Sequence, residues 1–224
     1  MKKAIKKITV FLCAILGAAL FVLAGCSEEQ TFVEKTYDSG DSAIESVEID
    51  VTDRELQIEQ SKDGEVHIYY HDSQKEYLEI GVSDDRLLSV KLTMDKDWTD
   101  FIGVKPSAEY RKIRICIPQG VVLSLSATTT NEAIKATGLS VAGSLSLNSN
   151  GGSVICERID AGNSIALTAK NGDITGSILG GWDDYTISCV IKKGDSNLPE
   201  NKEGGEKKLF ADCNNGNINI EFVS

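Results

Sequence analysis

Cys26 is the residue whose surroundings most clearly indicate a covalent chemistry. It closes the run Leu23-Ala24-Gly25-Cys26, a lipobox, in which the small residues at 24 and 25 let a lipoprotein signal peptidase approach the backbone. After export, the Cys26 thiol is expected to take up diacylglycerol, and Cys26 is expected to become the mature N-terminus. The sequence therefore predicts a lipid anchor at Cys26.

The residues before Cys26 have the composition of an export signal. Lysines at positions 2, 3, 6 and 7 form a basic segment, and an apolar run from 8 to 23 follows them. An uncleaved membrane anchor is the alternative, but a spanning helix needs about 20 apolar residues and this run is shorter. We therefore expect residues 1–25 to be a signal peptide and the mature protein to be extracytoplasmic, lipid-anchored to the outer face of the cell membrane.

Only two histidines, His67 and His71, are available for metal binding or base catalysis. They flank Ile68 and Tyr70 in a pattern typical of a strand, which would place both imidazoles on one face about 13 Å apart. That separation excludes a shared metal ion, and no Gly-x-Ser-x-Gly motif supplies an activated serine. We expect surface or cross-strand packing roles for both histidines, and no metal site.

Carboxylates and thiols give no sharper prediction. The chain has 34 acidic residues, so clusters such as the one at 95, 97 and 100 or the pair at 183 and 184 arise readily, although such pairs can cleave glycosides or bind a cation. Besides Cys26, the mature chain has four cysteines without any Cys-x-x-Cys pairing, namely Cys116, Cys156, Cys189 and Cys213. Three of these four stand in apolar alternation. We expect buried free thiols, with one disulfide of unassigned partners as the alternative.

Aromatic residues in irregular segments are the remaining candidates for ligand contact. Trp98 and Phe101 lie in an insertion between strands, and Trp182 and Tyr185 follow a Gly-Gly pair. Aromatic rings in loops can stack on sugar rings or insert at a membrane interface. The alternative is that they cover the open ends of the core.

The charge of the chain restricts its partners. The whole chain has a net charge of −11, and loss of the four lysines of the signal would bring the exported part to about −15. Nucleic acid and anionic lipid headgroups are therefore poor partners.

Apolar residues of the mature chain alternate with period two, which is typical of half-buried strands. The alternating groups are 47, 49 and 51; 66, 68 and 70; 78, 80 and 82; 88, 90 and 92; and 113, 115 and 117. Residues 27–41 show no such periodicity. The sequence predicts an all-β fold, with the lipidated Cys26 and a flexible tether over 26–44 and one domain over 45–224.

The second half of the chain contains a repeat of about 20 residues. Leu145 and Leu147 correspond to Ile165 and Leu167, and the same pattern returns 44 residues after 165, at Leu209. A unit this short cannot bury its apolar row alone, so each coil must cover its neighbour. We therefore predict a β-solenoid with coils of about 20 residues.

Asn-Gly pairs between the repeated strands indicate sharp corners, at 150–152, 171–173 and 215–217. Asp173 at one corner leaves a single calcium site as an alternative. A phosphate-binding loop is disfavoured because no Lys-Ser/Thr follows these glycines.

Together with the closing segment from Asn214 to Phe222, these features resemble a bacterial family called "putative adhesins", whose relatives include accessory proteins of Gram-positive envelope-stress operons. The resemblance covers roughly residues 45–224, including the aromatic insertion from Trp98 to Phe101. It implies a β-solenoid exposed outside the cytoplasmic membrane, and it transfers no catalytic residues.

These observations lead to a functional expectation. We expect an envelope lipoprotein whose solenoid is a non-catalytic, adhesin-like binding module for cell-wall glycan or a neighbouring membrane protein, with no cofactor. An accessory or sensory role in envelope stress is one alternative. A glycan-cleaving β-helix enzyme is the other.

Overall fold

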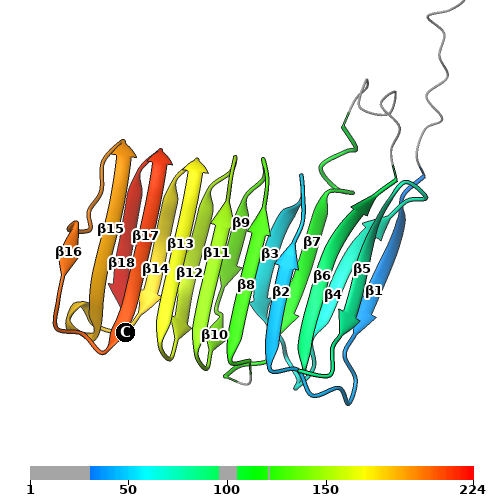
Figure 1. Cartoon of the computed structure of the whole chain (residues 1–224), viewed down its shortest axis with the longest axis horizontal. Coiled ribbons are helices and arrows are strands. Elements are labelled where there is room, and N and C mark those ends of the chain that lie inside the picture. The colour runs from blue at the N-terminus through cyan, green and yellow to red at the C-terminus, as the bar shows by residue number, and fades with distance from the viewer. Residues whose placement is uncertain (1–30, 96–104, 121) are drawn as a thin grey trace, which may run out of the picture.

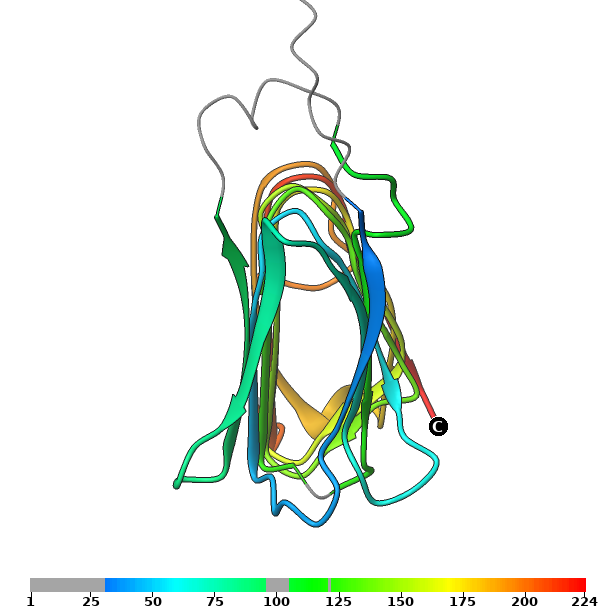
Figure 2. The same cartoon turned by 90° about the vertical axis from the view of Figure 1, so that its right-hand side faces the viewer.

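The computed structural model describes residues 31–95, 105–120 and 122–224. Strands dominate these residues and form two sheets that face each other along the whole molecule (Figure 1). Viewed along the stack, each coil is a flattened loop with one strand in each sheet (Figure 2). Within these described ranges, no helix has the length and apolarity needed to cross a membrane.

The first sheet, called sheet 1 here, includes one edge strand that continues directly from the N-terminal segment. In spatial order sheet 1 contains β1 (Val33–Asp38), β4 (His67–Asp72), β7 (Lys112–Ile117), β3 (Glu55–Gln60), β9 (Ile134–Thr137), β12 (Val154–Ala161), β14 (Ile174–Leu179) and β18 (Ile218–Val223), and β10 (Ser140–Val141) pairs with β12.

The opposite sheet, sheet 2, has the longer strands near the C-terminus. In spatial order it contains β16 (Asn201–Lys202), β15 (Tyr185–Lys193), β17 (Lys207–Asn215), β13 (Ser164–Asn171), β11 (Ser144–Ser149), β8 (Ser124–Thr129), β2 (Ser46–Asp50), β6 (Leu87–Met94) and β5 (Glu76–Val82).

The predicted repeat is confirmed as a register between neighbouring coils. Leu145 of β11 lies beside Leu125 of β8 and Ile165 of β13, so residues 20 apart stand side by side in parallel strands. Leu209 of β17 lies beside Ile165, which accounts for the spacing of 44. The five alternating groups of the first half also form strands, namely β2, β4, β5, β6 and β7. The β-solenoid prediction is therefore correct.

At both ends of the stack the order in space departs from the order in the chain. The first coil, β2 and β3, lies between the β6–β7 coil and the β8–β9 coil. The last coil, β17 and β18, lies between the β13–β14 coil and β15. Antiparallel pairs then finish the ends, with β1 on β4 and β5 on β6 at one end and β16 on β15 at the other. Antiparallel strands thus close both edges at the N-terminal end of the stack and the edge of sheet 2 at the other end, whereas sheet 1 ends there with β18, which pairs in parallel with β14.

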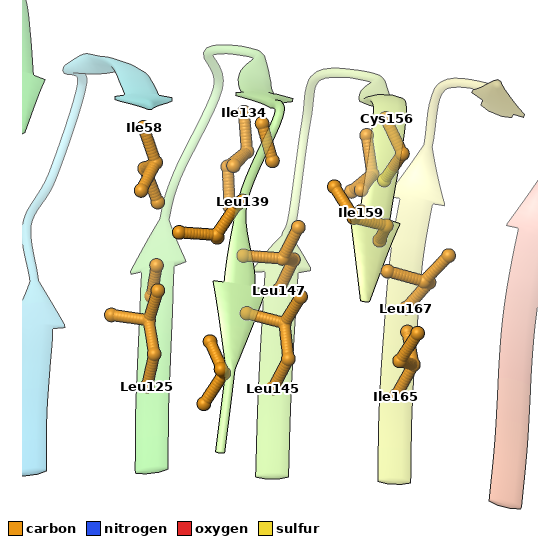
Figure 3. Close-up of a cluster of buried hydrophobic side chains, with 14 of the residues drawn as sticks. Ile58, Leu125, Ile134, Leu139, Leu145, Leu147, Cys156, Ile159, Ile165 and Leu167 are labelled. Atoms are coloured by element: carbon orange, nitrogen blue, oxygen red, sulfur yellow. The ribbon is translucent and has the colours of Figure 1, made fainter. Parts of the chain in front are cut away.

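The space between the sheets is filled by the inward residues of each coil (Figure 3). Leu147, Leu167 and Ala211 occupy equivalent positions in successive coils, and each is fully buried. Burial of one leucine side chain contributes about 1.5–3 kcal/mol, so the repeated row is the main source of stability. The inside positions predicted from the repeat are confirmed.

The Asn-Gly corners also stack on one another. Gly172 has a φ of +154°, and a Cβ atom there would lie 2.6 Å from the carbonyl oxygen of Gly152 in the preceding coil. No side chain fits between backbones this close. Asp173, the residue considered for calcium, accepts a hydrogen bond from the Asn217 backbone amide at 2.7 Å and so links two successive corners.

One boundary predicted from the sequence is wrong. Residues 33–38 fall inside the predicted tether, yet they form β1, which pairs with β4 along its whole length. Residues 33–38 lack the apolar alternation by which the other strands were predicted. The reason is that β1 lies at the edge of sheet 1 and its side chains are largely exposed, so it buries no apolar row.

Candidate binding surface

Of the four aromatic residues proposed for ligand contact, Trp98 and Phe101 lie outside the described residues, as does the lipidation residue Cys26. Trp182 begins the short helix η2 (Trp182–Asp184) at the C-terminal end of the stack. Its ring meets Phe222 edge-on at 5.5 Å, and 42% of the residue stays exposed. These contacts are those of an end cap, and ligand contact by Trp182 stays a prediction.

The prediction of ligand contact at Tyr185 is wrong. Tyr185 is completely buried, and its hydroxyl donates a hydrogen bond of 2.8 Å to the backbone carbonyl of Leu179. Burial raises the pKa of this phenol to about 12. Tyr185 starts β15, and its ring fills the end of the core beside Phe222. Tyr185 is in alternation with Ile187 and Cys189, which are also buried, and this alternation is the sequence signal for its inward position.

The two histidines are held by structural contacts. His67 lies between two carboxylates, with Nδ1 2.5 Å from Asp38 and Nε2 3.0 Å from Asp63. The ring of His71 packs against Tyr110 with ring centroids 5.3 Å apart. Among the described residues, no three His, Cys, Asp or Glu side chains gather closely enough to hold a metal ion.

Of the acidic residues singled out in the sequence, Asp183 and Asp184 make contacts within the end of the stack. Asp183 is nearly fully exposed and faces Lys202 at 3.8 Å, whereas Asp184 accepts a hydrogen bond from the Gly181 backbone amide. Asp95 is exposed at the end of the described segment, and Asp97 and Asp100 lie outside it.

The four cysteines of the domain are buried and have free thiols. Burial raises the pKa of Cys156 to about 12, and burial together with a hydrogen bond to Glu59 raises that of Cys116 to about 11. A thiol with so high a pKa is a poor nucleophile at neutral pH. Their environment is therefore that of small core residues.

The outward face of sheet 2 has an unusual composition. On the three central strands β8, β11 and β13, ten positions alternate with the buried core positions and point away from it, and Lys170 near the end of β13 is one of them. The other nine residues are Ser124, Ser126, Thr128, Ser144, Ser146, Asn148, Ser164, Ala166 and Thr168. None of these nine is charged, although charged residues make up 25% of the chain. We call these nine residues the hydroxyl face.

The hydroxyl face is regular in two directions. Along the stack, equivalent outward side chains recur once per strand, at about 4.8 Å, and along each strand they recur every second residue. Seven of the nine carry a hydroxyl group. Some neighbours are hydrogen bonded, since Ser124 Oγ donates to Ser46 Oγ at 2.9 Å and Ser164 Oγ donates to Ser144 Oγ at 3.0 Å. Rigid parallel strands thus hold an uncharged array of donors and acceptors.

An exposed aromatic ring borders this array. Phe210 of β17 lies beside Ala166 of β13 and Ser188 of β15, and 39% of it is exposed. Its two strand neighbours are small, so neither covers the ring. Val190 lies two residues further along β15 and is also exposed.

Sequence reasoning missed the hydroxyl face and Phe210. The repeat was followed through apolar residues alone, whereas the serines at 124, 144 and 164 have the same spacing of 20. That second series is the signal that would have located the face.

Comparisons with known proteins are consistent with this architecture. Residues 44–220 match a family model described as Toastrack DUF4097. No curated protein matches the chain.

Two of the solved structures that are similar to this chain come from Clostridium sporogenes and Bacteroides fragilis. A "putative cell adhesion protein" from Clostridium sporogenes is 11% identical, and the match covers 87% of this chain and 100% of that one with a TM-score of 0.62. This likeness shows the fold. A "putative adhesin" from Bacteroides fragilis is 12% identical over 86% and 98% of the two chains, but its TM-score of 0.33 carries no argument.

Proposed function

The chain belongs to the Toastrack DUF4097 family, and from that premise we propose that it is an envelope lipoprotein whose solenoid binds cell-wall glycan without catalysing a reaction. The observation that carries this proposal is the hydroxyl face. Nine uncharged outward positions on three aligned strands, in a strongly acidic chain, suit a ligand that is itself polar and rich in hydroxyl groups.

The lipid anchor is the second part of the proposal. The lipobox ending at Cys26 supports it. The position of β1 limits the distance between this anchor and the folded domain. Only six residues separate Cys26 from Val33, the first residue of β1, and a chain spans at most about 3.3–3.6 Å per residue. The N-terminal end of the stack therefore lies within about 25 Å of the point of lipid attachment.

A non-catalytic role is supported by how the reactive side chains are used. The imidazole of His67 is engaged by two carboxylates, and the thiols of Cys116 and Cys156 have raised pKa values. These groups serve packing and ion pairing. Binding through a rigid surface is the function that fits them.

The test is a pull-down of the purified lipidated protein, in detergent, by isolated cell wall. We expect wall to retain the wild type and to release Ser146→Glu, which places a charge in the centre of the hydroxyl face. Thr175→Glu makes the same change on the outer face of sheet 1 and is the control. Retention of both variants, or no retention of the wild type, would contradict the proposal.

An accessory role beside a membrane protein is the second candidate, and the short distance between Cys26 and β1 favours it. It predicts that the protein co-purifies with a membrane protein after mild crosslinking of cells. It also predicts that isolated wall does not retain the purified protein. Release of soluble sugar from wall by the purified protein would instead support the enzyme alternative.

A further inference from the structure

The geometry of the hydroxyl face points to one class of ligand, and we infer that this is an uncharged polysaccharide whose chain lies along the axis of the stack, across the strands. This inference rests on the proposed binding of wall glycan, and it specifies the chemical class of the glycan and the direction in which its chain lies on sheet 2.

Three rows of side chains cross the strands of the face. The first joins Ser46, Ser124, Ser144 and Ser164. The second joins Ser126, Ser146, Ala166 and Phe210, and the third joins Thr128, Asn148, Thr168 and Asp212. Each row advances by one strand, about 4.8 Å, which is close to the length of one pyranose unit in an extended chain. A polysaccharide lying along a row therefore meets equivalent groups at each sugar.

The charges around the face select an uncharged ligand. Glu48 and Asp50 of β2 border it on one side, and Asp212 and Lys208 of β17 border it on the other. Lys170 lies at the end of β13, next to Thr168 in the outward series, and is a single basic residue there. The chain as a whole has a net charge of −11. A polyanionic glycan would be repelled by these borders and would find no cluster of basic residues on the face itself.

Phe210 offers a stacking position at the end of the second row. Its exposed ring follows Ala166, a residue without a polar group, so this end of the row is apolar and suits the C–H face of a sugar ring. The third row, beside it, carries the hydroxyl groups of Thr128 and Thr168. Asn148 Oδ1 and Asp212 Oδ1 lie on either side of Thr168, but both atoms are buried below the surface, without a hydrogen-bond partner among the described residues. The hydroxyl groups are therefore the part of this row that a sugar can reach.

The test measures binding of the full lipidated protein, in detergent, to neutral N-acetylglucosamine oligomers of two, four and six units by calorimetry. Because the ligand lies across successive strands, we expect affinity to rise steeply with length over this series. Phe210→Ala is expected to weaken binding of the hexamer at least tenfold. Ile155→Ala removes an equally exposed apolar residue from sheet 1 and is expected to leave binding unchanged.

Four outcomes would overturn the inference. The first two are an affinity that does not depend on oligomer length, and equal effects of Phe210→Ala and Ile155→Ala on binding of the hexamer. The third is that polygalacturonate, a polyanion, competes effectively with the neutral oligomers. The fourth is that the protein binds wall but does not bind the neutral oligomers. The proposed function is tested independently of these oligomer measurements, because it is contradicted when the wild-type protein does not bind isolated wall. Circular dichroism of both variants establishes that a loss of binding is not a loss of fold.

Discussion

His67 joins β1 to the turn before β4, because its two ring nitrogens face carboxylates of Asp38 and Asp63. Only the doubly protonated imidazolium donates to both at once. The hydrogen bonds to Asp38 and then Asp63 raise the pKa of His67 above its ordinary value of about 6.5. His67 also lies beside Cys116 of β7 and has the ring of Tyr69 at a centroid distance of 6.4 Å.

This contact predicts a pH dependence of stability. The pKa of His67 is higher in the folded than in the unfolded chain, so its contribution is complete below the unfolded pKa and is lost as the pH rises through the folded pKa. We expect His67→Gln to lower the free energy of unfolding more at pH 5.5 than at pH 9, measured by urea denaturation. His71→Gln is the matched control. An NMR titration that puts the His67 pKa at or below 6.5 would contradict this account.

Inside and outside positions alternate along β13, and this alternation gives a prediction at the scale of one strand. Leu167 is fully buried, whereas its neighbour Thr168 points outward. Leu167→Lys removes a core leucine and buries a charge, so we expect a loss of at least about 3 kcal/mol in the free energy of unfolding. Thr168→Lys places the same charge beside Asp212 at the surface and is expected to change stability little. Equal tolerance of both variants by chemical denaturation would mean that the alternation is wrongly assigned.

The corners give a second prediction at this scale. Gly172→Ala would force a Cβ atom to within 2.6 Å of the Gly152 carbonyl group, at a φ that side chains rarely adopt. We expect a loss of more than about 1 kcal/mol, seen as a lower denaturation midpoint. Gly64, by contrast, has open space where a Cβ would be added, so Gly64→Ala is expected to stay within about 0.5 kcal/mol of the wild type. A nearly neutral Gly172→Ala would show that the corners do not stack this closely.

The dimensions of the whole molecule limit how far it reaches. Sheet 2 has nine strands, so the stack is about 40 Å long at about 4.8 Å per strand. If Cys26 carries the proposed lipid, at most about 25 Å separates it from β1, and the far end of the stack would lie within about 65 Å of the membrane. In a thick-walled cell the protein would stay beneath the wall surface. We therefore expect antibody to label cells stripped of wall and not intact cells, and strong labelling of intact thick-walled cells would exclude this short reach.

The anchor itself is tested by Cys26→Ala. Two acyl chains on one residue give stable membrane attachment, which one chain does not. We expect the wild type in the membrane fraction and the variant in the medium or mislocalised. Cys13→Ala, in the same hydrophobic segment, is the control and is expected to fractionate as the wild type does. Unchanged membrane fractionation of Cys26→Ala would remove the lipoprotein proposal and leave the binding face untouched.

The amino-acid sequence by itself determined the class of fold, because strand periodicity is a local property. Side chains of a strand alternate between its two faces, so the spacing of Val47 and Ile49 is enough to indicate a half-buried strand. The repeat of 20 residues is also local, and it correctly placed Leu147 and Leu167 in the core. The Asn-Gly pairs likewise located the corners, since few other residues adopt those conformations.

Tertiary structure alone decided the order of the coils and the surface that they create. The place of β2 and β3 between later coils depends on pairing between segments more than 70 residues apart, and no local pattern encodes such a choice. The hydroxyl face exists only because three separate strands stand in register, so that serines 20 residues apart become neighbours at the distance between hydrogen-bonded strands.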